Sequence, residues 1–242
     1  ETAETYSFVH ILLQETCYGT LLKEERQTLH LKAAEVLEAS PEGEKRVQGL
    51  AEHYYRSAQP EKALPYLWRA AETASRRFAS DLGLLYAERC LELLGARAQA
   101  LGVRAAAVLC RQGELHIMAS SPERAMASFR ACLCALGPAE PMRVEVYRRI
   151  GRLHMLAGEA DSARRAFEEA IGCACDDGLP ERQLLAVYYE LAALHFRSGE
   201  EESARKWLGK AAAGAQGLGL GAEPPESEDI HELIPVYSFL AA

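Results

Sequence analysis

The chain has 242 residues, of which 49% are hydrophobic and 26% are charged, so a folded protein is expected rather than a disordered one. Its 35 acidic and 27 basic residues give a formal net charge of −8, which argues against a nucleic-acid-binding surface because such a surface needs a basic stripe to displace phosphate counterions. No apolar run reaches about 18 residues, so no membrane span is expected. The seven cysteines lie mostly in helical patterns, which favours free thiols in a reducing, cytoplasmic compartment.

The first 40 residues predict a small helical subdomain. Residues 6–10 read as a short β-like run, and two amphipathic helices are expected between this run and Pro41. The pattern consists of residues at fixed spacing: Phe8, His10, Leu13, Tyr18, Leu21, Arg26, Leu29, His30, Ala34, Leu37 and Glu38. It is similar to the segment that joins the ATPase module to helical repeats in STAND-type signal-transduction ATPases and in soluble-type, multidomain adenylate cyclases. The resemblance implies the tail of a winged-helix-like subdomain, with a nucleotide-handling domain upstream in a longer chain.

Four later stretches align with one another without gaps, at residues 48–71, 110–133, 148–171 and 189–212. Core-type residues recur at steps of three and four, and a break divides each stretch into two predicted helices. The shared positions are a small residue, a ring three residues later, an alanine on the second helix and a bulky apolar residue four further on. They are Ala51, Tyr54, Ala63 and Leu67; Gly113, His116, Ala125 and Phe129; Gly151, His154, Ala163 and Phe167; and Ala192, His195, Ala204 and Leu208.

Each stretch therefore predicts a helical hairpin, because small residues let the two backbones approach closely. The pattern resembles the tetratricopeptide repeat, which implies an all-α fold: a right-handed α-solenoid of stacked hairpins. Gly151 follows Gly113 by 38 residues and Ala192 follows Gly151 by 41, so the spacing exceeds the family's 34 by about one and two helical turns. The predicted domains are residues 1–40, the helical segment; 41–220, the repeats; and 221–242, an acidic linker with an apolar tail.

Residues 72–108 fit the repeat less well. They still predict an amphipathic helix, which we expect to belong to one irregular repeat. Its apolar side consists of Leu82, Leu85, Tyr86, Cys90, Leu93 and Leu94.

The three histidines at the ring position could be ligands or pH switches, since histidine titrates near neutral pH. Tyr54 occupies the same position in the first stretch, however, and successive repeats are separated by roughly 10 Å, one helix diameter. We therefore expect His116, His154 and His195 to pack inside separate hairpins rather than to converge on one site.

Two cysteine pairs, Cys132 with Cys134 and Cys173 with Cys175, could suggest a four-thiolate zinc site. Residues i and i+2 of a helix point roughly 200° apart, so one pair cannot readily bind one ion. The pairs are also not equivalent in the repeat. We expect small-residue packing here, with no metal and no cofactor.

The sequence contains no phosphate loop of the form Gly-x-x-x-x-Gly-Lys-Ser/Thr. Carboxylate pairs such as Glu168 with Glu169 lie on predicted exposed helix, and no serine or cysteine has a recognisable nucleophile setting. We expect no catalytic residue in the chain, although the resemblance allows a parent protein that is an ATPase or an adenylate cyclase.

The remaining hypothesis is a binding surface on the concave side of the stacked hairpins, which their first helices would line. Arg148 and Arg152 are one turn apart and could bind a carboxylate, while Tyr189 and Phe196 are two turns apart and could anchor an apolar side chain. A solvated face or packing between repeats is the alternative for these residues. The full candidate set is Glu114, Ile117, Arg148, Arg152, Met155, Tyr189 and Phe196.

The sequence thus predicts a non-catalytic interaction or regulatory module whose partner is a protein, a peptide or another domain of the same chain. A DNA-associated regulator is the alternative, because winged-helix remnants can bind DNA. Its basic residues, Lys23, Arg26, His30 and Lys32, lie among Glu24, Glu25 and Glu35.

Overall fold

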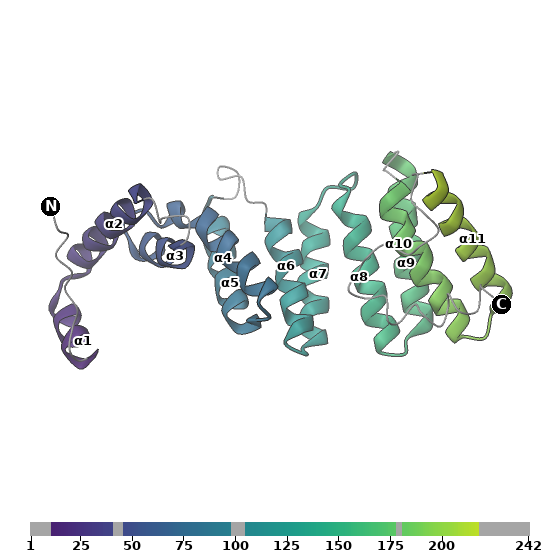
Figure 1. The fold of residues 1–242 in the computed structure, drawn as a ribbon, viewed down its shortest axis with the longest axis horizontal. Helices are drawn as coiled ribbons and strands as arrows, with labels where there is room; N and C mark the ends of the chain where they lie inside the picture. Colours follow the sequence, from purple (N-terminus) through teal and green to yellow (C-terminus); the bar gives the residue numbers. More distant parts are fainter. Residues whose placement is uncertain (1–10, 41–45, 98–104, 178–180, 218–242) are drawn as a thin grey trace. The chain divides into compact units, whose positions relative to one another are not determined.

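The computed structural model describes residues 11–40, 46–97, 105–177 and 181–217. All regular structure in these residues is helical, which confirms the all-α prediction (Figure 1). The chain divides into two compact units, Glu1–Ala119 and Ser120–Ala242, called here the N-terminal and C-terminal units. The β-like run expected at residues 6–10 and the tail expected at 221–242 lie outside the described residues.

In the N-terminal unit each helix from α2 onward packs against the next one along the chain. Its buried core includes Leu50, Tyr54, Leu64 and Leu67, which are at most 2% exposed. The elements are α1 (Ile11–Thr20), α2 (Lys23–Ala39), α3 (Val47–Arg56), the 3₁₀ turn η2 (Pro60–Ala63), α4 (Leu64–Arg76), α5 (Ser80–Arg97) and α6 (Ala105–Met118).

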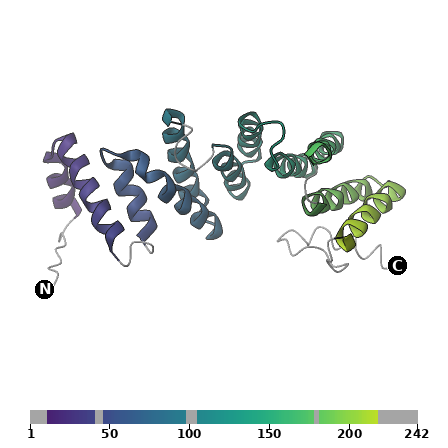
Figure 2. The same cartoon turned by 90° about the horizontal axis from the view of Figure 1, so that it is seen from above.

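The C-terminal unit contains α7 (Pro122–Ala135), α8 (Met142–Leu156), α9 (Ala160–Asp177), α10 (Glu181–Arg197) and α11 (Glu201–Gly217). The hairpins predicted at 148–171 and 189–212 correspond to α8–α9 and α10–α11, and each pair packs closely (Figure 2). α10 also packs against α9 and α8, so the two hairpins stack. Of the hairpin predicted at 110–133, α6 belongs to the N-terminal unit and α7 to the C-terminal unit.

The two hairpins of the C-terminal unit turn at glycines with a left-handed backbone. Gly158 has a φ of +77° and Gly199 a φ of +76°, a conformation that glycine adopts without steric cost. Each glycine follows the small residue of its repeat by seven positions, and Ser120, at the same place in the 110–133 stretch, has a φ of +54°. The break between helices therefore has a fixed position in the repeat.

Close packing of a small residue against a ring holds α8 to α9. A Cβ atom added at Gly151 would lie 2.4 Å from Cε1 of Phe167, and Phe167 is fully buried. Ala163, on the same helix as Phe167, is also fully buried. The helices approach this closely because no side chain separates them at Gly151.

In the region that fits the repeat poorly, α5 lies between the end of α4 and the start of α6, and it packs on both of these helices. Tyr86, Cys90 and Leu94 are at most 6% exposed, as expected for its apolar side. Leu82 and Leu85 are 36% and 41% exposed, so this side is only partly covered.

Candidate functional site

A line of hydrogen-bonding rings connects α1, α2 and α3. The hydroxyl of Tyr18 lies 2.9 Å from Nε2 of His30, and Nδ1 of His30 lies 2.9 Å from Nδ1 of His53. Burial lowers the pKa of both histidines, and the His53 charge and Arg56 lower that of His30 further. The contact between the two Nδ1 atoms requires one nitrogen to donate and the other to accept, so it needs a neutral ring.

A carboxylate of α2 anchors that helix to the next hairpin. The hydroxyls of Tyr54 and Tyr66 both donate to Glu38, and their rings stack with centroids 5.6 Å apart. These hydrogen bonds hold the pKa of Glu38 below its ordinary value, while burial and Glu38 raise the pKa of Tyr66 to about 12. The α2–α3–α4 region is therefore tied together by polar contacts as well as by its core.

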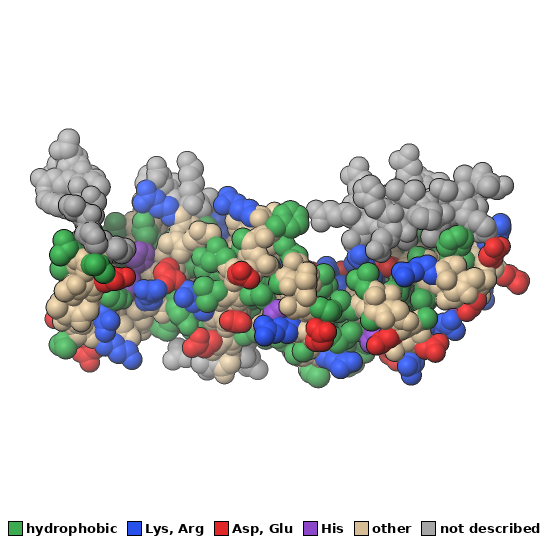
Figure 3. Space-filling view, turned by 90° about the horizontal axis from the view of Figure 1, so that it is seen from below, with side chains coloured by type: hydrophobic (Ala, Val, Ile, Leu, Met, Phe, Trp, Pro, Cys, Tyr) green, Lys and Arg blue, Asp and Glu red, His purple; other side chains and the backbone are tan. Residues whose placement is uncertain are grey.

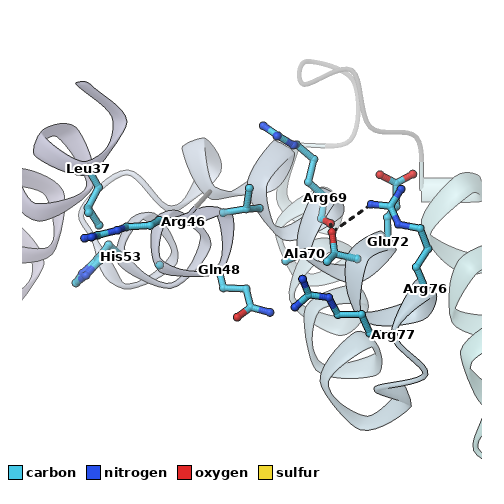
Figure 4. A pocket seen from close by; sticks show the side chains of 12 residues that line it. Leu37, Arg46, Gln48, His53, Arg69, Ala70, Glu72, Arg76 and Arg77 are labelled. Carbon is cyan, nitrogen blue, oxygen red and sulfur yellow. Dashed lines mark hydrogen bonds between the residues drawn. The ribbon is translucent and has the colours of Figure 1, made fainter. Parts of the chain in front are cut away.

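The same three helices form a groove of about 720 Å³, called here the arginine groove (Figure 4). Leu37 of α2 lies at one end, the first residues of α3 form one wall, and one side of α4 forms the other. Its polar lining is mostly basic. The lining residues are Leu37, Arg46, Val47, Gln48, Gly49, His53, Arg69, Ala70, Glu72, Thr73, Arg76 and Arg77.

Three of the four arginines form one stripe along α4 and the residue that caps its C-terminus, at positions i, i+7 and i+8. Arg69, Arg76 and Arg77 are all exposed. Among contacts between described residues, Arg76 alone of the three has a side-chain hydrogen bond, of 3.4 Å, to the hydroxyl of Thr73. Figure 4 shows Arg46 reaching toward Leu37 from the start of α3. Among the described residues that line the groove, Glu72 is the single acid. The groove thus carries a net positive charge in a chain whose net charge is −8.

Many other arginines of the chain are paired with acids. Arg56 and Arg89 share Glu52, and Arg164 lies 3.2 Å from Glu200. Figure 3 shows acidic and basic side chains interspersed over the face that it draws. In the described part of the chain, neither Arg69 nor Arg77 forms an ion pair, which distinguishes the arginine groove from these sites.

Arg148 and Arg152, which were predicted to bind a partner's carboxylate, both lie close to a carboxylate of the chain itself. Nη1 of Arg148 lies 2.9 Å from Oε1 of Glu190, and Nε of Arg152 lies 3.5 Å from the same oxygen. Arg148 also pairs with Glu145 at 2.8 Å. Burial opposes the charge on Glu145, but hydrogen bonds from Arg148 and the charge of Arg149 hold its pKa below the ordinary value. This cluster joins α8 to α10.

The other predicted surface residues are mostly covered. Met155 and Tyr189 are 8% and 5% exposed, and Phe196 packs against the core of the C-terminal unit. Met155 also lines a smaller cavity of about 170 Å³. In the N-terminal unit Glu114 pairs with Arg111, and Ile117 is 38% exposed.

The repeat histidines lie in separate hairpins. Nδ1 of His154 lies 2.7 Å from Glu159, and Nδ1 of His195 lies 2.8 Å from Glu200, so each ring contacts the acid that follows the turn of its own hairpin. His116 is 8% exposed and belongs to the N-terminal unit.

The cysteines of the first pair differ in environment, since Cys132 is buried and Cys134 is exposed. Cys173 is half-buried, and the side chain of Cys175 lies outside the described residues. Nowhere in the described ranges do three His, Cys, Asp or Glu side chains gather as a metal site. In those ranges, too, no helix has the length and apolar character to cross a membrane.

Sequence reasoning missed the arginine groove. A signal was present, because residues 69–77 read RAAETASRR and place three arginines on one side of a helix. The contribution of Arg46 and of α2 has no comparable signal, since it depends on how α2, α3 and α4 pack.

The described fold is of the tetratricopeptide-like class, as predicted. No protein-family model and no curated protein matches the sequence. Among solved structures, MamA has a TM-score of 0.57 at 15% identity, covering 83% of this chain and 99% of its own. A putative kinesin light chain from Podosopora anserina, with nearly identical TPR-like repeats, has a TM-score of 0.56 at 14% identity, covering 81% of this chain and 97% of its own.

Aspartyl phosphate phosphatase F from Bacillus subtilis has a TM-score of 0.63 at 14% identity. That match covers 95% of this chain and 63% of the phosphatase. Identities this low establish a shared fold and nothing about activity or partners.

Proposed function

We propose that the chain is a protein-interaction module without catalytic activity, and that the arginine groove binds a segment of its partner. The observation that carries this proposal is the groove itself: about 720 Å³ of open space, lined by four arginines, in a tetratricopeptide-like scaffold of net charge −8. The Arg148–Arg152 pair is a weaker candidate, because Glu190 already binds both arginines.

A panel of immobilised twelve-residue peptides of varied composition tests this function. We expect the 242-residue chain to bind a subset of the panel, and the double variant Arg69→Glu/Arg77→Glu to lose that subset. Retention of the same peptides by the double variant would refute the assignment of the groove. Magnesium-dependent hydrolysis of ATP or GTP by the purified chain would refute the non-catalytic function.

We further propose that the module is the sensor or scaffold part of a larger nucleotide-handling signalling protein, either a STAND ATPase or a soluble-type adenylate cyclase. The N-terminal sequence pattern supports this. Five apolar side chains of α1, of α2 and of the short connection between them also support it, because they are 51% to 71% exposed and form a surface that a neighbouring domain would cover. These residues are Leu12, Leu13, Leu22, Leu29 and Val36.

The parent proposal has its own test. The amino-acid sequence that precedes Glu1 in the full-length protein should contain a phosphate loop or a cyclase domain. If that domain is expressed with the module, substitution of Leu29 by Glu should weaken their association. An upstream sequence without any nucleotide-binding motif would contradict the proposal.

A further inference from the structure

We infer that the arginine groove binds an extended acidic segment of the partner through two or three side-chain carboxylates. This inference rests on the proposed function and specifies its ligand. Three observations carry it: the spacing of the arginines on α4, the absence of ion pairs at Arg69 and Arg77 among the described residues, and the helix dipole at the start of α3.

The spacing of the arginines matches an extended chain. Arg69 and Arg76 are seven residues apart on α4, which places their Cα atoms roughly 10 Å apart along the helix axis at 1.5 Å per residue. An extended peptide rises about 3.3 Å per residue and directs every second side chain to the same face. Acidic residues at alternate positions of a five-residue segment would therefore reach from Arg69 to Arg76 and Arg77.

In the described part of the chain, two of the groove's arginines have no acidic partner. Arg69 and Arg77 have no ion pair with any described residue, and the hydrogen bond of Arg76 goes to an uncharged hydroxyl. Arg148 shows the contrasting state, because it holds both Glu145 and Glu190. A partner that supplies carboxylates would give the groove the charge-assisted hydrogen bonds that this internal cluster already has.

The start of α3 adds to the preference for anions. Arg46 is the residue before the helix, and it makes no side-chain cap. The first turn of α3 lines the groove through Val47, Gln48 and Gly49, so the positive end of the helix dipole lies against the groove. The N-terminal end of α3 and the arginine stripe therefore both favour a negatively charged ligand.

Favourable interaction with the negative C-terminal end of the α4 dipole does not explain the presence of every arginine in the groove. Cations near a helix C-terminus are stabilising within about the last turn, which explains Arg76 and Arg77. Arg69 lies about two turns before the end of α4, and Arg46 belongs to the segment before α3. The end of α4 therefore does not account for Arg69, whose place in the groove we attribute to ligand binding.

A protein segment fits the groove better than a nucleic acid does. The stripe spans little more than two helical turns, and the lining includes the apolar residues Leu37, Val47 and Ala70. Duplex DNA needs a longer basic surface, because its affinity comes from displacing many counterions. An acidic peptide can place carboxylates on the stripe and apolar side chains against Leu37 and Val47.

Fluorescence anisotropy tests the inference with a labelled peptide of alternating glutamate and serine, blocked at both ends. The matched control peptide has glutamine in place of glutamate. We expect the glutamate peptide to bind at least about tenfold more tightly than the glutamine peptide, and more weakly as salt shortens the range of the attraction. Equal binding of the two peptides would overturn the inference.

Variants of the protein locate the binding. Arg69→Gln/Arg77→Gln should weaken binding about tenfold or more, as expected when charge-assisted hydrogen bonds are lost. The control variant Arg124→Gln/Arg130→Gln removes two exposed arginines of α7 in the other unit. It should bind the glutamate peptide with the same affinity as the unmodified 242-residue chain. Equal loss in both variants would show a general charge effect and overturn the inference. Far-ultraviolet circular dichroism would verify that each variant is folded.

Two further ligands separate the alternatives. Duplex DNA bound more tightly than the glutamate peptide, and lost in the groove variant, would assign the groove to nucleic acid and overturn the inference. A peptide whose only carboxylate is its free C-terminus should bind weakly. If the peptide panel instead selects apolar sequences that need Arg69 and Arg77, the proposed function stands and the acidic ligand is wrong.

Discussion

At the scale of single residues, the contact between His30 and His53 makes the stability of the N-terminal unit depend on pH. Burial and Arg56 lower the pKa of both histidines in the folded state, and the two rings repel each other when both are charged. Glu52 acts in the opposite direction on both rings. The unfolded chain, in which histidine keeps its ordinary pKa of about 6.5, therefore takes up protons first as the pH falls.

We expect the free energy of unfolding to be fully retained above pH 6.5 and to fall as the pH drops below that value, because protons then favour the unfolded chain. Urea unfolding at pH 7.5 and pH 5.5 measures this change. The variant His53→Asn should lose much of the difference between the two pH values. Glu38 and Glu145 also have lowered pKa values, but they affect the free energy of unfolding only when the pH falls below about 4.5, the ordinary pKa of glutamate. An unchanged pH dependence in His53→Asn would contradict the role of the histidine pair.

The turn glycine of α8–α9 supports a second prediction at this scale. Gly158→Ala should lower the free energy of unfolding by about 1–2 kcal/mol, because the left-handed conformation costs an L-residue that much. A Cβ at this position would meet no neighbour within 4 Å, so the effect would come from the backbone alone. Gly172 lies at an exposed and equally uncrowded position inside α9, where alanine favours the helix more than glycine does. Gly172→Ala should therefore raise the free energy of unfolding by about 0.5–1 kcal/mol. Thermal and urea unfolding check both signs.

At the scale of helical elements, the pairing of small and bulky residues determines how closely two helices approach. Gly151 contacts Phe167 in one hairpin, whereas the next hairpin has Ala192 and Leu208 at the same positions. The two hairpins thus contain alternative solutions to one packing problem. An extra methyl group on the first helix goes with a smaller side chain on the second.

This relationship predicts a double-mutant cycle. Gly151→Ala alone should destabilise the protein by about 1–3 kcal/mol, because the new Cβ overlaps the ring of Phe167 in a filled core. Phe167→Leu alone should also destabilise it, because it leaves a cavity. The double variant should be more stable than the sum of the two losses predicts, by about 1 kcal/mol or more. Strict additivity would show that the ring moves aside without cost.

The hairpins could be predicted from the sequence because their determinants lie within about 24 residues. The glycine, alanine and aromatic positions that bring α8 and α9 together are close in sequence, and they repeat in α10–α11. Contacts between different repeats have no such signal. The carboxylate bound by Arg148 belongs to Glu190, 42 residues away, and nothing in either local pattern pairs the two.

The arginine groove could not be predicted from local sequence patterns for the same reason: it depends on contacts between different helices. The stripe on α4 can be seen in the sequence, but sequence alone cannot show that α2 and the start of α3 leave open space beside it. The exposure of Leu82 and Leu85 on α5 likewise depends on what packs against that helix, so an amphipathic pattern predicts a buried side without predicting how much of it is covered.

At the scale of the whole molecule, a repeat protein is stabilised by the sum of its repeats and of the interfaces between neighbouring repeats. The cluster of Arg148, Arg152 and Glu190 lies at such an interface, between α8 and α10. The side chains of Arg148 and Glu190 are only 14% and 13% exposed, so an unpaired charge there would be poorly solvated. The interface between these two hairpins therefore depends on a charge match as well as on apolar packing.

Glu190→Gln should lower the free energy of unfolding by about 1–3 kcal/mol, because Arg148 and Arg152 then lose a charged acceptor in a mostly buried place. Glu168→Gln, at an exposed position of α9, is the matched control and should change it by less than about 0.5 kcal/mol. Hydrogen exchange read by mass spectrometry should show faster exchange in α8 and α10 and unchanged exchange in α3 and α4, which belong to the other compact unit. Equal acceleration in α3 and α4 would mean that the chain unfolds as one cooperative body rather than repeat by repeat.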